Sequence, residues 1–204
     1  RPAVDRIDAR RPAPAPARRM SPHSPTRHRH ISLIGAPTDI GASCIGARMG
    51  PGALRVAGLT DALQRCGLAV QDLGDLHGPD NPCQEAVDGW RHLREVTTWN
   101  ERVHAVVHGE LASGRLPILL GGDHCLAIGS ISAVARHCRE TGKKLRVLWL
   151  DAHADFNTSQ VTPSGNIHGM PVACLCGMGP RELTHLGGDA PAMRPDEIRQ
   201  IGIR

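Results

Sequence analysis

Residues 116–125 read LPILLGGDHC and residues 145–155 read LRVLWLDAHAD, and these two stretches decide the fold. Each begins with a short apolar run, over 116–120 and 145–150, which is typical of a buried strand in a parallel sheet. Each run is followed closely by residues that can ligate a metal. The segment 126–140 between them has the length of a helix, so together they predict a strand–helix–strand unit.

The same alternation continues on both sides of this unit. ISLIG at 31–35 predicts a strand, followed by a glycine-rich loop over 36–52 and a helix that begins near Pro51 and carries Leu54, Val56, Leu59 and Leu63. Further predicted elements are a strand at 68–73, a loop at 74–90, helices at 90–113 and 170–177, a short helix opened by Pro195, and a fifth strand starting at 201–204. This order predicts an α/β domain over 31–204, a doubly wound parallel sheet flanked by helices in three layers.

Residues 1–30 differ in composition from the rest of the chain. They hold eight arginines against Asp5 and Asp8, a local charge of +6, whereas the remainder has 16 basic and 18 acidic residues. Frequent proline and absent apolar periodicity predict a disordered tail. Three interpretations compete: an upstream-extended gene start with Met20 nearer the true beginning, which we favour, a targeting segment, or a segment that binds an acidic surface.

Composition also limits the classes of partner. The near-neutral remainder shows no basic face for nucleic acid, and no apolar stretch approaches the ~20 residues needed to cross a membrane. The seven cysteines are odd in number and scattered, which favours free thiols in a reducing cytoplasm over a disulfide framework. We therefore expect a cytoplasmic protein with no nucleic-acid or membrane partner.

Metal-capable side chains follow both strands of the central unit. His124 comes after the first strand, and Asp151, His153 and Asp155 come after the second. Ligands of open parallel sheets bind beyond the carboxyl ends of the strands. In Asp-x-His-x-Asp, an extended backbone would turn alternate side chains to one side, so all three groups can face one site. Carboxylate and imidazole ligands suit Mn, Fe, Co or Zn.

Five further histidines, His77, His92, His104, His108 and His137, have no partner at ligand spacing. His104 and His108 are four residues apart on the predicted 90–113 helix. A surface metal pair is one interpretation, and a solvated helix face is the one that we favour.

The sequence resembles the ureohydrolases, the arginase and agmatinase superfamily. The resemblance lies in GGDHCLAIGS (121–130), LDAHADFNTS (150–159), SGNIHGMP (164–171) and IGAPTDIGASCIGARMGPGALR (34–55), and it covers residue 31 to the end of the chain. Within this superfamily, SGNIHGMP preceded by DFNT favours arginases over agmatinases. Cys125 stands where serine is commoner, and we expect little consequence.

The resemblance implies a hydrolase that converts L-arginine to L-ornithine and urea with two Mn²⁺ ions. His124, Asp151 and Asp155 would bind the first ion, and Asp151 would bridge to a second that His153 also binds. Two cations sharing one water lower its pKa from near 16 toward ~7, which makes hydroxide available. His168 would be the proton shuttle, with Asp155 also catalytic. The substrate contacts implied are His153, Asn157, Thr162, Ser164, Gly165 and Asn166.

The resemblance also implies residues beyond position 204. Family members continue with acidic residues for the substrate amino group, an Asp-x-Asp motif for the metals and a glutamate for the guanidinium. We therefore expect an incomplete fold, weak manganese binding and little turnover from the 204-residue chain, as a fragment or an incomplete gene model. The complete protein would form a trimer or hexamer. Alternatives are an agmatinase, another guanidino-acid hydrolase, or an inactive relative that binds partners.

Overall fold

The computed structural model describes residues 30–204, so the predicted tail at 1–30 lies outside the described residues except for His30. The first strand, β1 (His30–Ala36), begins one residue before the predicted domain boundary. It lies between β2 (Ala69–Asp75) and β3 (Leu116–Gly121), and both pairings are parallel. Two further strands, β4 (Val147–Leu150) and β5 (Ile198–Ile201), form a second parallel pair.

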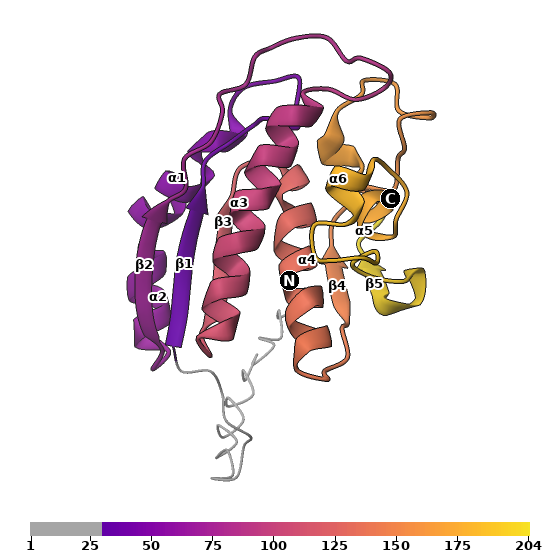
Figure 1. Cartoon of the computed structure of the whole chain (residues 1–204). Helices are drawn as coiled ribbons and strands as arrows, with labels where there is room; N and C mark the ends of the chain where they lie inside the picture. The colour runs from indigo at the N-terminus through magenta and orange to yellow at the C-terminus, as the bar shows by residue number, and fades with distance from the viewer. Residues whose placement is uncertain (1–29) are drawn as a thin grey trace, which may run out of the picture.

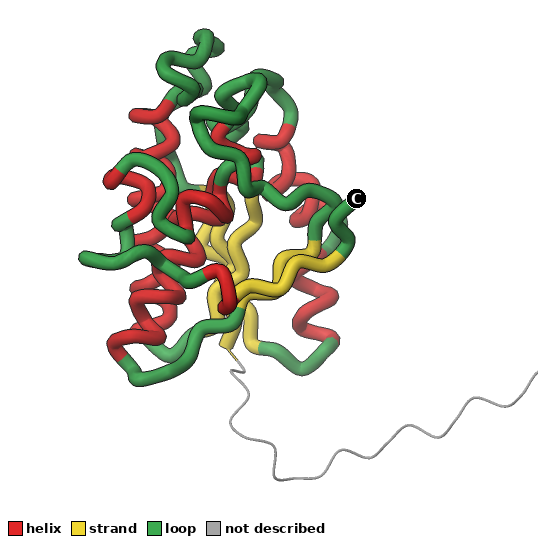
Figure 2. Tube along the Cα trace, turned by 90° about the vertical axis from the view of Figure 1, so that its right-hand side faces the viewer, coloured by secondary structure: helices red, strands yellow, loops and turns green. Residues whose placement is uncertain are grey.

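The prediction of a parallel sheet flanked by helices is confirmed. Among the described residues, however, the hydrogen bonding between strands divides the sheet into a three-stranded part, β2-β1-β3, and a two-stranded part, β4-β5. In Figure 1, α3 (Leu93–Ala112) and α4 (Ala127–Glu140) run side by side in front of the strands. Figure 2 shows the strands as a central layer with helices on both sides. The helix α4 connects the two parts of the sheet.

The three-stranded part has an apolar cluster on each face. On one face, Ile31, Leu33 and Leu120 pack with Leu59 and Leu63 of the helical segment that precedes β2. On the other face, residues of β1 pack against α3, whose buried apolar side chains recur at helical spacing: Val96, Trp99, Val103 and Val107. Every residue of β1 after His30 is buried, because helices cover both sides of this strand.

The predicted helix from Pro51 through Leu63 is wrong in one respect, since it is two helices. The helices α1 (Gly50–Val56) and α2 (Leu59–Arg65) are separated at Gly58, whose φ of 81° lies in the left-handed region that glycine adopts without strain. Leu59 and Leu63 do pack on the sheet, whereas Leu54 is exposed and Val56 is 92% exposed.

Several predicted boundaries also shift. The long helix starts at Leu93, after His92 in a left-handed conformation, and β4 starts at Val147 rather than 145. The fifth strand lies at Ile198–Ile201 instead of 201–204, directly after a single turn of 3-10 helix, η4 (Pro195–Glu197). The 170–177 prediction corresponds to α5 (Pro171–Leu175), and α6 (Arg181–Thr184) is a helix that the sequence analysis did not predict. Short 3-10 turns complete the elements: η1 (Ala47–Met49), η2 (His124–Leu126) and η3 (Ile167–Gly169).

The favoured interpretation of His104 and His108 as a solvated face is wrong for His104. His104 is a buried residue of α3. Its ring stacks on that of His108, with 6.0 Å between the centroids. All seven cysteines lie in the described part of the chain and carry free thiols. None of the helices over residues 30–204 is long and apolar enough to span a membrane.

Candidate metal centre

Three potential ligands meet where β3 and β4 end. Nδ1 of His124 lies 3.0 Å from Oδ2 of Asp151 and 2.9 Å from Oδ2 of Asp155. One donor atom from each of the three residues lies within 4.8 Å of the others. Two ligands bound at a right angle to one ion, each about 2.1 Å from it, lie about 3 Å apart. The donor set therefore fits a divalent cation.

The turn that presents His124 depends on Gly122. A Cβ atom at this position would lie 1.7 Å from the carbonyl oxygen of Thr38, so only glycine fits. The backbone N–H of Gly122 donates to Ala36 O at 3.1 Å, and that of Asp123 donates to Thr38 O at 2.9 Å. These bonds attach the end of β3 to the loop after β1 and set the direction in which His124 leaves the strand.

Asp123 adds a connection that the sequence analysis missed. Its carboxylate accepts hydrogen bonds from the backbone N–H of Gly41 at 2.8 Å and of Cys125 at 2.9 Å. The carbonyl of Gly41 in turn accepts from the backbone N–H of His168 at 3.2 Å. Asp123 thus joins the turn that holds His124 to the loop that holds His168. An aspartate at a helix start is a known cap signal that could have indicated this role.

The electrostatics of the cluster favour charged groups. Burial alone would lower the pKa of His124, but the hydrogen bond to Asp155 and the charges of Asp155, Asp151 and Asp123 outweigh it, so the pKa is raised. The pKa of Asp151 is lowered, chiefly because its carboxylate accepts the backbone N–H of His153. A carboxylate that stays ionised is a suitable ligand for a cation.

His153 lies at the exposed edge of this group and contacts Asp151 alone among the three. Its Nδ1 is 3.2 Å from Oδ1 of Asp151, but its side chain is 81% exposed. The prediction that an extended backbone turns alternate side chains to one side is wrong, because β4 ends at Leu150 and Asp155 has a φ of 48°. The carboxyl group of Asp155 instead reaches the site from a residue with a left-handed backbone conformation, and the backbone oxygen of Asp155 accepts the N–H of Val172 in α5.

A cavity of about 770 Å³ opens over the cluster. His124, Asp151, His153 and Asp155 line it together with two other residues singled out in the sequence, Asn157 and His168. The backbone N–H of Asn157 donates to Gly169 O at 3.1 Å, which connects the two segments that carry these side chains. The cavity therefore brings the metal-capable side chains together with a second imidazole and a side-chain amide.

The remaining predicted substrate contacts do not line this cavity, and they form the loop before η3. Thr162 Oγ1 accepts the N–H of Gly165, and Ser164 Oγ accepts the N–H of Asn166. The Asn166 side chain is buried and donates from Nδ2 to Ser43 Oγ at 3.1 Å. These bonds shape the loop, and direct contact between these side chains and a substrate stays a prediction.

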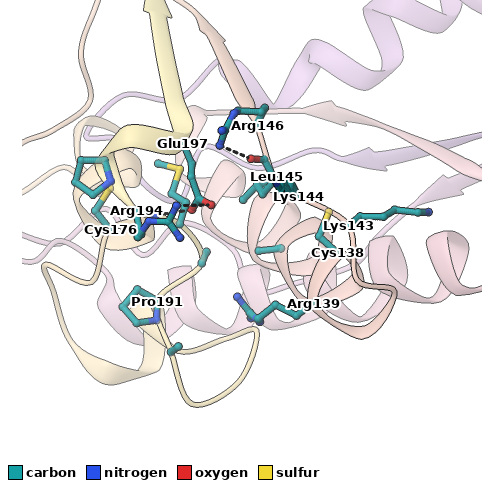
Figure 3. Close-up of a pocket in the computed structure, with 15 residues that line it drawn as sticks. Cys138, Arg139, Lys143, Lys144, Leu145, Arg146, Cys176, Pro191, Arg194 and Glu197 are labelled. Carbon is teal, nitrogen blue, oxygen red and sulfur yellow. Dashed lines mark hydrogen bonds and ion pairs between the residues drawn. The ribbon is translucent and has the colours of Figure 1, made fainter.

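A second cavity, of about 630 Å³, lies at the other end of β4 and shares no residue with the first (Figure 3). Arg139 and Arg194 line it, but Arg139 donates to Gly187 O, and Arg194 is paired with Asp196 and Glu197. Glu197 is the only carboxylate that lines this second cavity, so the cavity offers no ligand set for a divalent cation.

A parallel α/β domain with imidazole and carboxylate groups converging beyond its strand ends defines a class of metal-binding domain. The match to known proteins then names the family. A family model described as the arginase family matches residues 29–204. The chain belongs to the arginase family.

Individual relatives agree with this assignment. The arginase of Bacillus caldovelox is 43% identical over 176 residues, which are 85% of this chain and 58% of the relative. Its crystal structure at pH 5.6 superposes with a TM-score of 0.78 at 42% identity, covering 85% of this chain and 57% of that chain. An Entamoeba histolytica arginase in complex with L-ornithine gives a TM-score of 0.77 at 32% identity, over 88% of this chain and 60% of that one. The chain thus spans less than two thirds of the length of these relatives.

Proposed function

We propose that the complete protein hydrolyses L-arginine to L-ornithine and urea in arginine catabolism, and that it uses Mn²⁺. The observation that carries the proposal is the convergence of His124, Asp151 and Asp155 at a cavity that His168 and Asn157 also line. Support also comes from relatives named arginase at 43% and 39% identity, and from one arginase structure in complex with L-ornithine.

The ligand types support a site for a pair of divalent ions. Nδ1 of His124 and the carboxylates of Asp151 and Asp155 would hold one ion, and His153, at the exposed edge of the cavity, would turn inward to help hold the second. Bound metal supplies a water whose pKa falls toward ~7. Binding requires His124 to be neutral, and the low pKa of Asp151 keeps its carboxylate available as a bridge.

The other cavity residues would handle the substrate. His168 faces the same cavity as the ligands, so its imidazole would carry a proton to the departing amine. Asn157 would contact the amino-acid end of arginine, with Thr162, Ser164, Gly165 and Asn166 contributing directly or through water. We further propose a cytoplasmic homo-oligomer, a trimer or hexamer.

Urea release tests this proposal in two proteins. The first is the 204-residue chain, which we expect to release little or no urea from L-arginine with Mn²⁺. The second is a chimera that joins residues 30–204 to the part of Bacillus caldovelox arginase that this chain does not cover. We expect Mn²⁺-dependent urea release from the chimera, lost in Asp151→Ala and kept in Asp61→Ala, on the exposed side of α2.

Agmatine and guanidinobutyrate are assayed beside L-arginine. A folded chimera that binds Mn²⁺ but prefers agmatine would contradict the substrate, and one that releases no urea from any of the three would contradict the activity. Robust turnover by the 204-residue chain would contradict the expectation that it releases little or no urea.

A further inference from the structure

The imidazole of His124 lies flat against an indole ring. The ring centroids of His124 and Trp149 are 4.4 Å apart, and their planes are inclined by 20°. Trp149 is the third residue of β4 and is only 4% exposed. It belongs to an apolar cluster that includes Val147 and Leu175. The indole is thus fixed by packing, and it forms a rigid surface beneath one metal-capable side chain.

The indole N–H does not explain the choice of tryptophan. Nε1 of Trp149 is buried and has no hydrogen-bond partner in the described part of the chain. A buried donor without a partner destabilises the fold, so the ring must contribute in another way. Its flat face is the part that contacts His124, and an aromatic face attracts positive charge.

We propose that Trp149 is a positioning residue of the metal centre. It fixes the plane of the His124 imidazole so that Nδ1 points at Asp151 and Asp155, which lie 3.0 and 2.9 Å away. The His124 side chain is otherwise about half exposed, and the indole limits its rotation. Because the ring is already held in this plane, less rotational freedom is lost when its nitrogen binds an ion. This inference rests on the proposed metal centre and goes beyond it.

Substitution separates this role from simple filling of the core. Trp149→Phe keeps an aromatic face and loses no hydrogen bond, so Mn²⁺ affinity should stay within about threefold. Trp149→Leu and Trp149→Met keep apolar volume without a ring, and their Mn²⁺ affinity should fall about tenfold. A structural role alone would lower the melting temperature of these variants and leave their Mn²⁺ affinity unchanged. The melting temperature of each metal-free variant, measured in parallel, shows that each is folded.

Fluorescence provides a readout that does not depend on catalysis. The chain has three tryptophans, Trp90, Trp99 and Trp149, and paramagnetic Mn²⁺ quenches an indole in contact with its ligand. We expect Mn²⁺ to quench the unaltered chain and to leave the emission of Trp149→Phe unchanged, although calorimetry still detects binding. Trp99→Phe is the matched control, because it also replaces a buried indole and should keep the quenching.

The outcomes are distinguishable. Equal Mn²⁺ dissociation constants for the unaltered chain, Trp149→Leu and Trp149→Met would overturn the positioning role and leave the metal centre intact. Quenching that persists in Trp149→Phe would also overturn it. If neither the unaltered chain nor the chimera that tests the proposed function bound Mn²⁺, the proposed function itself would be contradicted, and this inference with it.

Discussion

The two parts of the sheet differ in how many faces are covered. In the β2-β1-β3 part, α2 packs on one face and α3 on the other, and β1 is buried from Ile31 onward. In the β4-β5 part, Val147 and Trp149 face an apolar cluster that includes residues of α4 and α5. The alternate side chains of β4, Leu148 and Leu150, are 67% and 74% exposed. One face of this part is therefore open among the described residues.

This difference bears directly on the proposed metal centre. His124 follows the part covered on both faces, and its turn is held by Gly122 and Asp123. Asp151 and Asp155 follow the part that is open on one face. Parallel sheets are normally buried on both faces, so the open part is the less stable of the two. The centre thus combines one rigid ligand turn with one that is less constrained.

The largest expected effect is on the free energy of unfolding, when a leucine in each part of the sheet is replaced by alanine. Leu33→Ala in β1 removes a fully buried side chain and should lower the free energy of unfolding by roughly 2–5 kcal/mol. Leu148→Ala in β4 removes an exposed one and should change it by less than about 0.5 kcal/mol. Urea denaturation of both variants measures the difference. Equal losses would show that the open face of β4 is covered in solution and would break the comparison.

The second effect concerns the ligands. Asp151→Ala should weaken Mn²⁺ binding about 100-fold or more, because replacing even a residue that supports a ligand costs 10–100-fold. Its carboxylate lies 3.0 Å from His124 and 3.2 Å from His153. Calorimetric titration measures the change, with Asp61→Ala as the control that should bind normally. An unchanged dissociation constant would place the metal elsewhere.

The sequence predicted the succession of strands and helices along the chain, but not every local conformation. The apolar runs before His124 and Asp151 predicted that both strand ends carry ligands, because parallel strands present the same ends together. The left-handed φ of Asp155 and the break at Gly58 were not predictable from periodicity. The contact between Asn166 and Ser43 joins residues 123 positions apart, so it depends on tertiary packing that no local pattern encodes.

The third effect tests whether Asp123 holds the turn that carries His124. Asp123→Ala leaves the buried N–H groups of Gly41 and Cys125 without their acceptor and should lower the free energy of unfolding by roughly 1–3 kcal/mol. It should also loosen the connection to His168. Chemical denaturation measures the loss, and Asp80→Ala, which removes an exposed carboxylate, should have almost no effect. Equal stability of the two variants would show that Asp123 does not hold this turn.

The smallest effect is a pH dependence that originates in the α3–α4 layer. Burial, with smaller contributions from Arg136 and His108, lowers the pKa of His104 below its ordinary value of 6.5. The unfolded chain then binds this proton more readily, so stability present above pH 6.5 is lost as the pH falls below it. His104→Gln should lose less stability between pH 8 and pH 5 than the unaltered chain. His77→Gln, at an exposed position, should behave like the unaltered chain, and identical curves for all three would contradict the assignment.

The central claim is that His124, Asp151 and Asp155 converge on one divalent ion. Crystals of the chain grown with Mn²⁺, with diffraction data collected at the manganese absorption edge, test it most directly. The account predicts an anomalous peak between Nδ1 of His124 and the two carboxylates, at the base of the cavity that His168 lines. A structure in which these side chains diverge, or in which the manganese peak lies elsewhere, would contradict it.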